Sequence, residues 1–150
     1  MLQQDNLDTK VTSDANIIIA RSAFESGEMI KAEEAFAKVG ETASGEMKAE
    51  TLYYDAYFKY EEGNYKLSNV SVQEIASKYA EYRYWGAKGL VIMAKNFYAL
   101  EDAYQATYIL ESVIKKFSDF EDIAEQAKIE LNKIKIEEAK TNSSVILENE

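Results

Sequence analysis

Apolar side chains recur at helical spacing along most of the chain. The pattern begins near Asp14, where apolar residues follow one another at intervals of three, four and seven positions. Its first members are Ile17, Ile18, Ala20 and Phe24. No stretch shows the strict alternation of apolar and polar residues that is typical of a half-buried strand. We therefore expect an all-α protein.

Polar breaks divide this pattern into seven predicted helices. The first six cover residues 14–26, 28–39, 46–62, 64–79, 82–99 and 101–117. Glycine commonly ends a helix, and it follows each of the first three as Gly27, Gly40 and Gly63. A capping box made by Ser118 and Glu121 predicts the start of the seventh helix, which extends to about Ala139.

The two ends of the chain lack this periodicity. Residues 1–13 are polar and aperiodic, and the last ten residues are mostly polar. We therefore expect a flexible N-terminal segment over residues 1–13 and a flexible tail over residues 141–150. Between them, residues 14–140 form one predicted helical domain, which is long enough to bury a substantial core.

The third and fourth predicted helices differ in how much of their surface is apolar. In the third, only Thr51, Asp55 and Lys59 form a polar stripe, so we expect neighbours on most of its sides. Asp55 and Lys59 are four positions apart and can form an ion pair along the helix. In the fourth helix the inward positions are Leu67, Val72, Ile75 and Ala76.

One internal spacing occurs three times in the chain. A small residue is followed twelve positions later by a second small residue, and a larger apolar residue comes four positions after that. The three sets are Ala20, Ala32 and Phe36; Ala56, Ser68 and Val72; and Ala94, Ala106 and Leu110. The spacing within each set is constant while the sets lie 36 and 38 residues apart, which indicates stacked helix hairpins joined by long turns over 40–46 and 79–84.

At these residues the chain resembles the tetratricopeptide repeat family, whose small residues let two helices cross closely. The resemblance covers residues 14–140 and implies a right-handed superhelix of three antiparallel hairpins plus a C-terminal capping helix. Gly27 and Gly63 match the family's turn position, which Glu101 occupies in the third hairpin. The segment Lys-Lys-Phe-Ser-Asp-Phe looks like the repeat ends of bacterial envelope scaffold proteins. The chain departs from the family in having no proline.

Composition narrows the range of functions. The formal charge of −10 disfavours nucleic acid and anionic membrane surfaces as partners, and no segment is long and apolar enough for direct membrane insertion. The chain lacks cysteine and histidine, so it has neither a thiol nucleophile nor the commonest transition-metal ligand. Phosphate-loop, dinucleotide and nucleophile-elbow motifs are missing as well. We therefore expect no enzyme activity, no cofactor and no metal.

The resemblance also implies where a partner binds, because the first helix of each hairpin lines the concave face in that family. The matching positions are Ile17, Arg21, Phe24, Tyr53, Tyr57, Tyr60, Val91, Lys95 and Tyr98. A second, smaller patch of interface-type residues consists of Tyr82, Arg83 and Trp85. The alternative interpretation of both sets is internal packing, between helices in the first case and of the long turn in the second.

These expectations leave three hypotheses about function. The first is a non-catalytic scaffold that holds a peptide or a partner subunit in its concave groove. The second is a helical-repeat protein that binds a carbohydrate or another flat-faced solute through stacked tyrosines and Trp85. The third is a segment of a longer α-solenoid, which associates with itself or with further repeats through its uncapped N-terminal end. The compartment is the periplasm or envelope for a fragment of an exported bacterial protein, and otherwise the cytoplasm.

Overall fold

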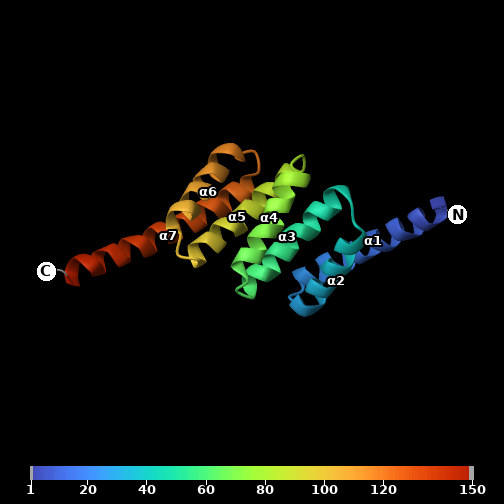
Figure 1. The fold of residues 1–150 in the computed structure, drawn as a ribbon, viewed down its shortest axis with the longest axis horizontal. Helices are drawn as coiled ribbons and strands as arrows, with labels where there is room; N and C mark the ends of the chain where they lie inside the picture. Colours follow the sequence, from blue (N-terminus) through green and yellow to red (C-terminus); the bar gives the residue numbers. More distant parts are fainter. Residues whose placement is uncertain (1, 149–150) are drawn as a thin grey trace. The chain divides into compact units, whose positions relative to one another are not determined.

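The chain is all-α. A computed structural model describes residues 2–148, which form seven α-helices and no strand (Figure 1). The helices are α1 (Leu2–Glu25), α2 (Met29–Thr42), α3 (Gly45–Glu61), α4 (Tyr65–Lys78), α5 (Arg83–Ala99), α6 (Ala103–Lys116) and α7 (Glu121–Glu148). The predicted fold class and the number of helices are confirmed.

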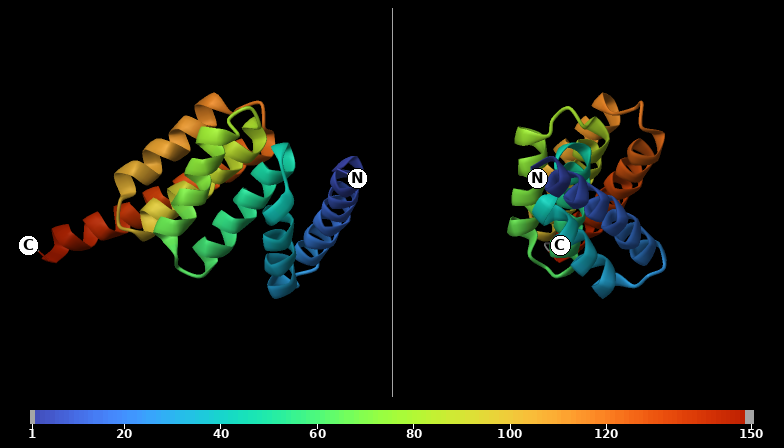
Figure 2. Two further views of the ribbon diagram at one scale, coloured as in Figure 1. Left: turned by 45° about the vertical axis from the view of Figure 1, so that its right-hand side comes forward. Right: turned by 90° about the vertical axis from the view of Figure 1, so that its right-hand side faces the viewer.

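Two compact units share these helices, and their boundary falls within α5. The first unit spans Met1–Gly86, in which α1 packs on α2, α2 on α3, and α3 on α4. The second spans Ala87–Glu150, in which α6 packs on α7. Figure 2 shows α1 with α2, α3 with α4, and α6 with α7 as antiparallel pairs.

The same backbone turn follows α1, α3 and α5. Its central residue has a positive φ in each case, +78° at Gly27, +82° at Gly63 and +65° at Glu101. The next residue donates its N–H to a carbonyl five positions earlier: Glu28 to Ala23, Asn64 to Lys59, and Asp102 to Phe97, at 2.8–2.9 Å. This is the hydrogen bond of a Schellman motif. The predicted equivalence of the three turn positions is confirmed.

The small residues of the repeat are fully buried, as close packing between helices requires. All six of them have an exposed fraction of 0%. They are Ala20, Ala32, Ala56, Ser68, Ala94 and Ala106. Ser68 fits such a site because its hydroxyl donates a 2.6 Å hydrogen bond to the carbonyl of Ala56, so that its polar atom is satisfied inside the hairpin. The apolar residues that follow them, Phe36, Val72 and Leu110, are buried as well.

The terminal helices are longer than predicted. We expected the first helix to begin near residue 14 and the last to end near residue 139, whereas α1 begins at Leu2 and α7 reaches Glu148. Apolar periodicity detects only the part of a helix that packs against something. No glycine or proline interrupts either extension, so each helix continues beyond its packed part.

The predicted long turn over residues 40–46 is wrong. Helix α2 continues through Gly40, and only Ala43 and Ser44 separate it from α3. A Cβ atom at Gly40 would lie 3.4 Å from the Oγ1 atom of Thr51. Gly40 therefore serves close packing of α2 on α3 and does not end the helix. The second predicted turn, over residues 79–84, is shorter than expected, since only residues 79–82 separate α4 from α5 and Arg83 and Tyr84 lie in α5.

Four details of the predicted faces and caps are also wrong. Ile18, Leu67 and Ala76 were expected to point inward and are exposed. Each lies one position from a buried residue, and one position turns the side chain by about 100° around a helix. The capping box fails because α7 begins at Glu121, which leaves Ser118 in the preceding turn and too early to cap it.

Candidate functional site

A strip of aromatic side chains crosses the first unit from α1 to α4. The rings of Phe24 and Tyr57 meet edge to face at 5.2 Å, and those of Tyr60 and Tyr65 lie 5.8 Å apart. Tyr57 and Tyr60 are three positions apart on α3 and share one face of that helix. All four side chains are half-buried. We call these four residues the aromatic strip.

The aromatic strip contains three of the predicted partner-binding residues and one that the sequence reasoning missed. Phe24, Tyr57 and Tyr60 were chosen as concave-face positions, and the structure brings them together. Tyr65 was missed because it is the first residue of α4, a helix that the resemblance places away from the groove. The only signal for it was its position directly after the turn at Gly63 and Asn64.

Arg21 lies one turn from Phe24 on α1 and forms an ion pair with α3. Its Nη2 atom lies 2.7 Å from Oε2 of Glu50 and its Nε atom 2.9 Å from Oε1, so both ends of the carboxylate are held. The Glu50 side chain is only 5% exposed, whereas that of Arg21 is 49% exposed. This hydrogen bonding to Glu50 raises the pKa of Arg21. Arg21 is therefore a cation in a fixed position at one end of the aromatic strip.

Three of the predicted partner-binding residues belong to the core. Ile17, Tyr53 and Val91 are buried, so none of them presents a side chain to a partner in this structure. Burial raises the pKa of the Tyr53 hydroxyl, whose ring meets that of Tyr54 at 5.0 Å. The burial of these three side chains agrees with the packing interpretation.

Tyr54 was not among the predicted positions, yet it holds the core of the first unit together. Its ring stacks on Phe36 with the centroids 3.9 Å apart and the planes at 12°. It also meets Phe24 edge to face at 5.0 Å, which ties the core to the aromatic strip. Burial is the largest of the effects that raise the pKa of its hydroxyl to about 12.

The last two predicted positions, Lys95 and Tyr98, lie on α5 within the second unit and are half-buried. Burial and the negative charge of Glu138 on α7 raise the pKa of the Tyr98 hydroxyl. Tyr98 thus faces an acidic neighbour inside its own unit. These two residues belong to the second unit, whereas the aromatic strip belongs to the first.

In the smaller predicted patch, the Trp85 ring packs against aromatic rings of the first unit. The Trp85 ring lies 5.3 Å from that of Tyr84, 5.7 Å from Tyr53 and 6.2 Å from Tyr54. Tyr82 is half-buried with its hydroxyl close to Gly45, while Arg83 is exposed. Since three aromatic rings already surround Trp85, its environment favours packing, and nothing here favours a carbohydrate site.

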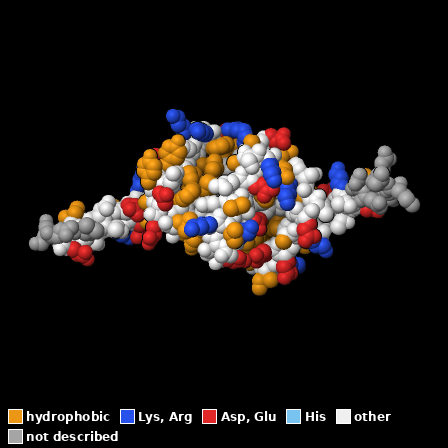
Figure 3. All heavy atoms as spheres, in the orientation of Figure 1, with side chains coloured by type: hydrophobic (Ala, Val, Ile, Leu, Met, Phe, Trp, Pro, Cys, Tyr) orange, Lys and Arg blue, Asp and Glu red, His pale blue; other side chains and the backbone are white. Residues whose placement is uncertain are grey.

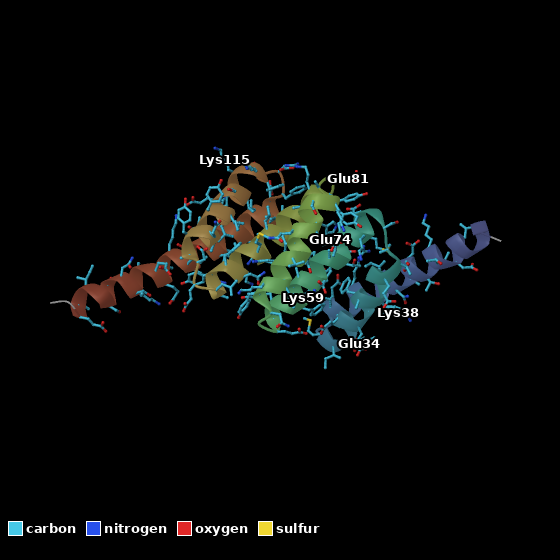
Figure 4. All side chains as sticks on the ribbon, viewed as in Figure 1. Glu34, Lys38, Lys59, Glu74, Glu81 and Lys115 are labelled. Carbon is cyan, nitrogen blue, oxygen red and sulfur yellow. The ribbon has the colours of Figure 1, made fainter. Side chains whose placement is uncertain are left out.

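A cleft between α2 and α3 lies on the other side of α3. Its volume is about 470 Å³, and Phe36, Leu52 and Phe58 contribute apolar surface to it. In Figure 3, acidic side chains gather between the lower ends of these two helices, and Figure 4 labels Lys59 near the lower end of α3. Asp55 points about 160° away from Tyr57 around the helix axis. The cleft and the aromatic strip are therefore separate surfaces.

Two lysines of the cleft, Lys59 and Lys48, have hydrogen-bond partners on its walls. Lys59 Nζ lies 2.7 Å from Oδ2 of Asp55, which also accepts a hydrogen bond from the hydroxyl of Ser71 on α4. This confirms the predicted Asp55–Lys59 pair. Lys48 donates a 2.6 Å hydrogen bond to the carbonyl oxygen of Gly40 on α2. Lys48 thus connects α3 to α2, and Asp55 connects α3 to α4.

At the lower end of the cleft, Glu33 of α2 lies close to Glu62, the residue that directly follows α3. Burial, followed by a hydrogen bond shared with Glu62 and the negative charge of that residue, raises the pKa of Glu33. Two carboxyl groups this close disfavour the state in which both are ionised. Within residues 2–148, no group of three or more carboxylates is arranged to hold a metal ion.

Comparison with known proteins does not assign the chain to a family. No family model and no curated protein matches the sequence. Among the helices that the structure describes, none has the length and apolar character that a bilayer span requires.

Proposed function

We propose that this chain is a non-catalytic scaffold of the tetratricopeptide type, which binds a peptide or a helix of a partner subunit across the aromatic strip. The observation that carries the proposal is the strip itself, in which Phe24, Tyr57, Tyr60 and Tyr65 form a half-exposed aromatic surface beside Arg21. Tyrosine and arginine are among the residue types that contribute most to protein interfaces.

The strip suits a binding role because its side chains are already ordered. Ring contacts hold Phe24 against Tyr54 and Tyr57, and the ion pair with Glu50 holds Arg21. Binding therefore immobilises few new side chains, each of which would otherwise cost about 0.5–1.5 kcal/mol. The chemistry favours a partner segment with apolar or aromatic side chains and a carboxylate near Arg21.

The assignment to the tetratricopeptide type draws support from two repeated features. The three Schellman turns recur at the spacing of the sequence repeat, and the six small residues of the repeat are fully buried. Both features suit a stack of similar helix hairpins. A scaffold from the bacterial envelope agrees with the sequence resemblance at the end of the third hairpin.

Selection from a peptide library tests this proposal and requires no identified partner. Random linear peptides displayed on phage are selected on the immobilised chain, and the enriched peptides are synthesised with a fluorescent label. We expect the double substitution Tyr57→Ala with Tyr60→Ala to weaken their binding by at least about tenfold in fluorescence anisotropy, because contacts at the centre of an interface carry most of the binding energy.

The control is an exposed pair of tyrosines elsewhere on the chain. Tyr104 and Tyr108 on α6 are both exposed and lie four positions apart, so alanine at these two positions removes the same chemistry from another surface. Arg21 is a poor test position, since its removal leaves the buried Glu50 carboxylate without its partner. The proposal is wrong if no peptide is enriched, or if both double variants bind the peptides equally well.

A further inference from the structure

The outer face of α7 carries two exposed isoleucines. Ile129 is 43% and Ile136 47% exposed. They are seven positions apart and thus within about 20° of each other around the helix. The packed residues of α7 lie on the opposite side; they are Ile123, Ala124, Ala127, Leu131 and Ile134. The two isoleucines are therefore not part of the packing of α7 on α6.

Charged residues flank these isoleucines in a defined order. Exposed Glu125 precedes Ile129 by one helical turn, and exposed Lys140 follows Ile136 by one turn. Between the isoleucines, Asn132 and Lys133 are exposed, and Lys133 forms an ion pair with Glu130 at 3.3 Å. The face therefore reads acidic, apolar, polar, apolar, basic in the direction of the chain.

We infer that this face binds a second copy of the same chain through an antiparallel α7–α7 contact. An antiparallel pair centred between residues 132 and 133 places Ile129 of each copy opposite Ile136 of the other. In the same register, Glu125 of each copy meets Lys140 of the other. Opposite charges therefore meet at both ends of an apolar centre, and a twofold axis closes the dimer.

The length of α7 agrees with this arrangement. From Ala139 to Glu148, every side chain that the structure describes is exposed, including those of Ile146 and Leu147. A helical segment without packing partners has little stability of its own in water. In the proposed dimer, Ser144 comes opposite Glu121, the first residue of α7 in the other copy, so Leu147 reaches the preceding turn, which contains the half-buried Phe117 and Phe120. The dimer thus gives the end of α7 a packing partner.

Charge exchange tests the contact and its direction. We expect sedimentation velocity to show a concentration-dependent dimer for the natural sequence. Glu125→Lys and Lys140→Glu should each weaken dimerisation by about tenfold or more. Each substitution puts two like charges opposite one another at both ends of the symmetric contact. The double variant should restore dimerisation, since it exchanges the two charges without changing the pairing. Glu111→Lys, an exposed position on α6, is the matched control and should dimerise normally.

Cysteine cross-linking locates the axis, and the natural chain has no cysteine to interfere. Oxidation should cross-link Asn132→Cys readily, because that position lies at the axis, and should leave Val11→Cys on α1 monomeric. A chain that is monomeric at all concentrations overturns the inference, as does a double charge variant that fails to dimerise. Cross-linking through Val11 and not through Asn132 also overturns it and assigns self-association to α1. None of these variants touches the aromatic strip, so peptide binding can succeed or fail independently.

Discussion

Glu101 has a backbone conformation that glycine adopts in the two equivalent turns. Its φ of +65° lies in the left-handed region, which costs a residue with a side chain about 1–2 kcal/mol. We expect Glu101→Gly to stabilise the chain by about 0.5–1 kcal/mol, because the relief of strain exceeds the extra entropy that glycine gives the unfolded chain. Urea denaturation measures the difference.

Gly63→Ala is the reverse experiment. Gly63 has a φ of +82°, and a Cβ atom there would have no neighbour within 4 Å, so only backbone strain separates alanine from glycine. This variant should lose about 1 kcal/mol. An unchanged or lowered stability of Glu101→Gly would show that the side chain of Glu101 contributes more than its backbone costs.

At the scale of single residues, the sequence predicts contacts whose residue spacing is repeated along the chain. It does not predict contacts between two particular residues that meet only once in the fold. Ala20 and Ala32 could be recognised as close contacts because the same spacing returns twice more. No comparable pattern announces the pair of Glu33 and Glu62, since these residues meet only once α2 packs on α3. For the same reason Arg21 could be selected as a cation but not recognised as the ion-pair partner of Glu50.

At the scale of helices, the interior of the array is predictable and its ends are not. The predicted helix over residues 46–62 agrees with α3, which spans Gly45–Glu61, because a glycine turn and a packed face mark it. Residues 7–12 of α1 have exposed polar and apolar side chains without a clear face, so nothing in their pattern distinguishes helix from coil. The predicted helix end at Gly40 is wrong because glycine is favoured both at helix ends and where two helices pack closely, and the sequence does not distinguish the two.

The packing of α2 on α3 makes stability depend on pH. The pKa of Glu33 is raised in the folded chain, so the folded state binds this proton more tightly than the unfolded state. Its contribution is fully present below the unfolded pKa and is lost as the pH rises through the folded pKa. Glu33→Gln should therefore stabilise the chain at neutral pH, by up to about 1 kcal/mol because solvent screens this group.

The advantage of Glu33→Gln should disappear at about pH 4, near the ordinary pKa of glutamate. Thermal unfolding of both proteins across this pH range measures the effect. Glu111→Gln on α6 is the control for loss of one exposed carboxylate, and it should show no such dependence. A Glu33→Gln variant that is equally or less stable than the natural chain at neutral pH would contradict the proposed proximity of Glu33 and Glu62.

At the scale of the whole molecule, the net charge of −10 opposes compaction. Salt screens this repulsion, and the Debye length falls from about 30 Å at 0.01 M to about 8 Å at 0.15 M. We expect the Tm to rise by about 2–4 °C over this range at neutral pH and fixed protein concentration, which corresponds to about 1 kcal/mol for a chain of this size.

Differential scanning calorimetry in increasing sodium chloride measures this rise. Screening predicts that most of the gain comes below about 0.15 M, whereas a general salting-out effect continues to grow at higher salt. A flat or falling Tm over the low range would show that local ion pairs such as Arg21–Glu50 contribute more than the repulsion between distant carboxylates.

The identity of the turns at Gly27 and Gly63 makes a whole segment of the chain removable. Deletion of residues 28–63 joins Gly27 directly to Asn64, which is the residue pair that the second turn already contains. Ala20 then stands twelve positions before Ser68, the spacing of every natural hairpin. The shortened chain keeps a complete turn and a complete hairpin at the junction. Turn and spacing therefore allow the chain to be shortened by one whole repeat, while α1 loses Tyr54 and Glu50, its ring and ion-pair partners on α3.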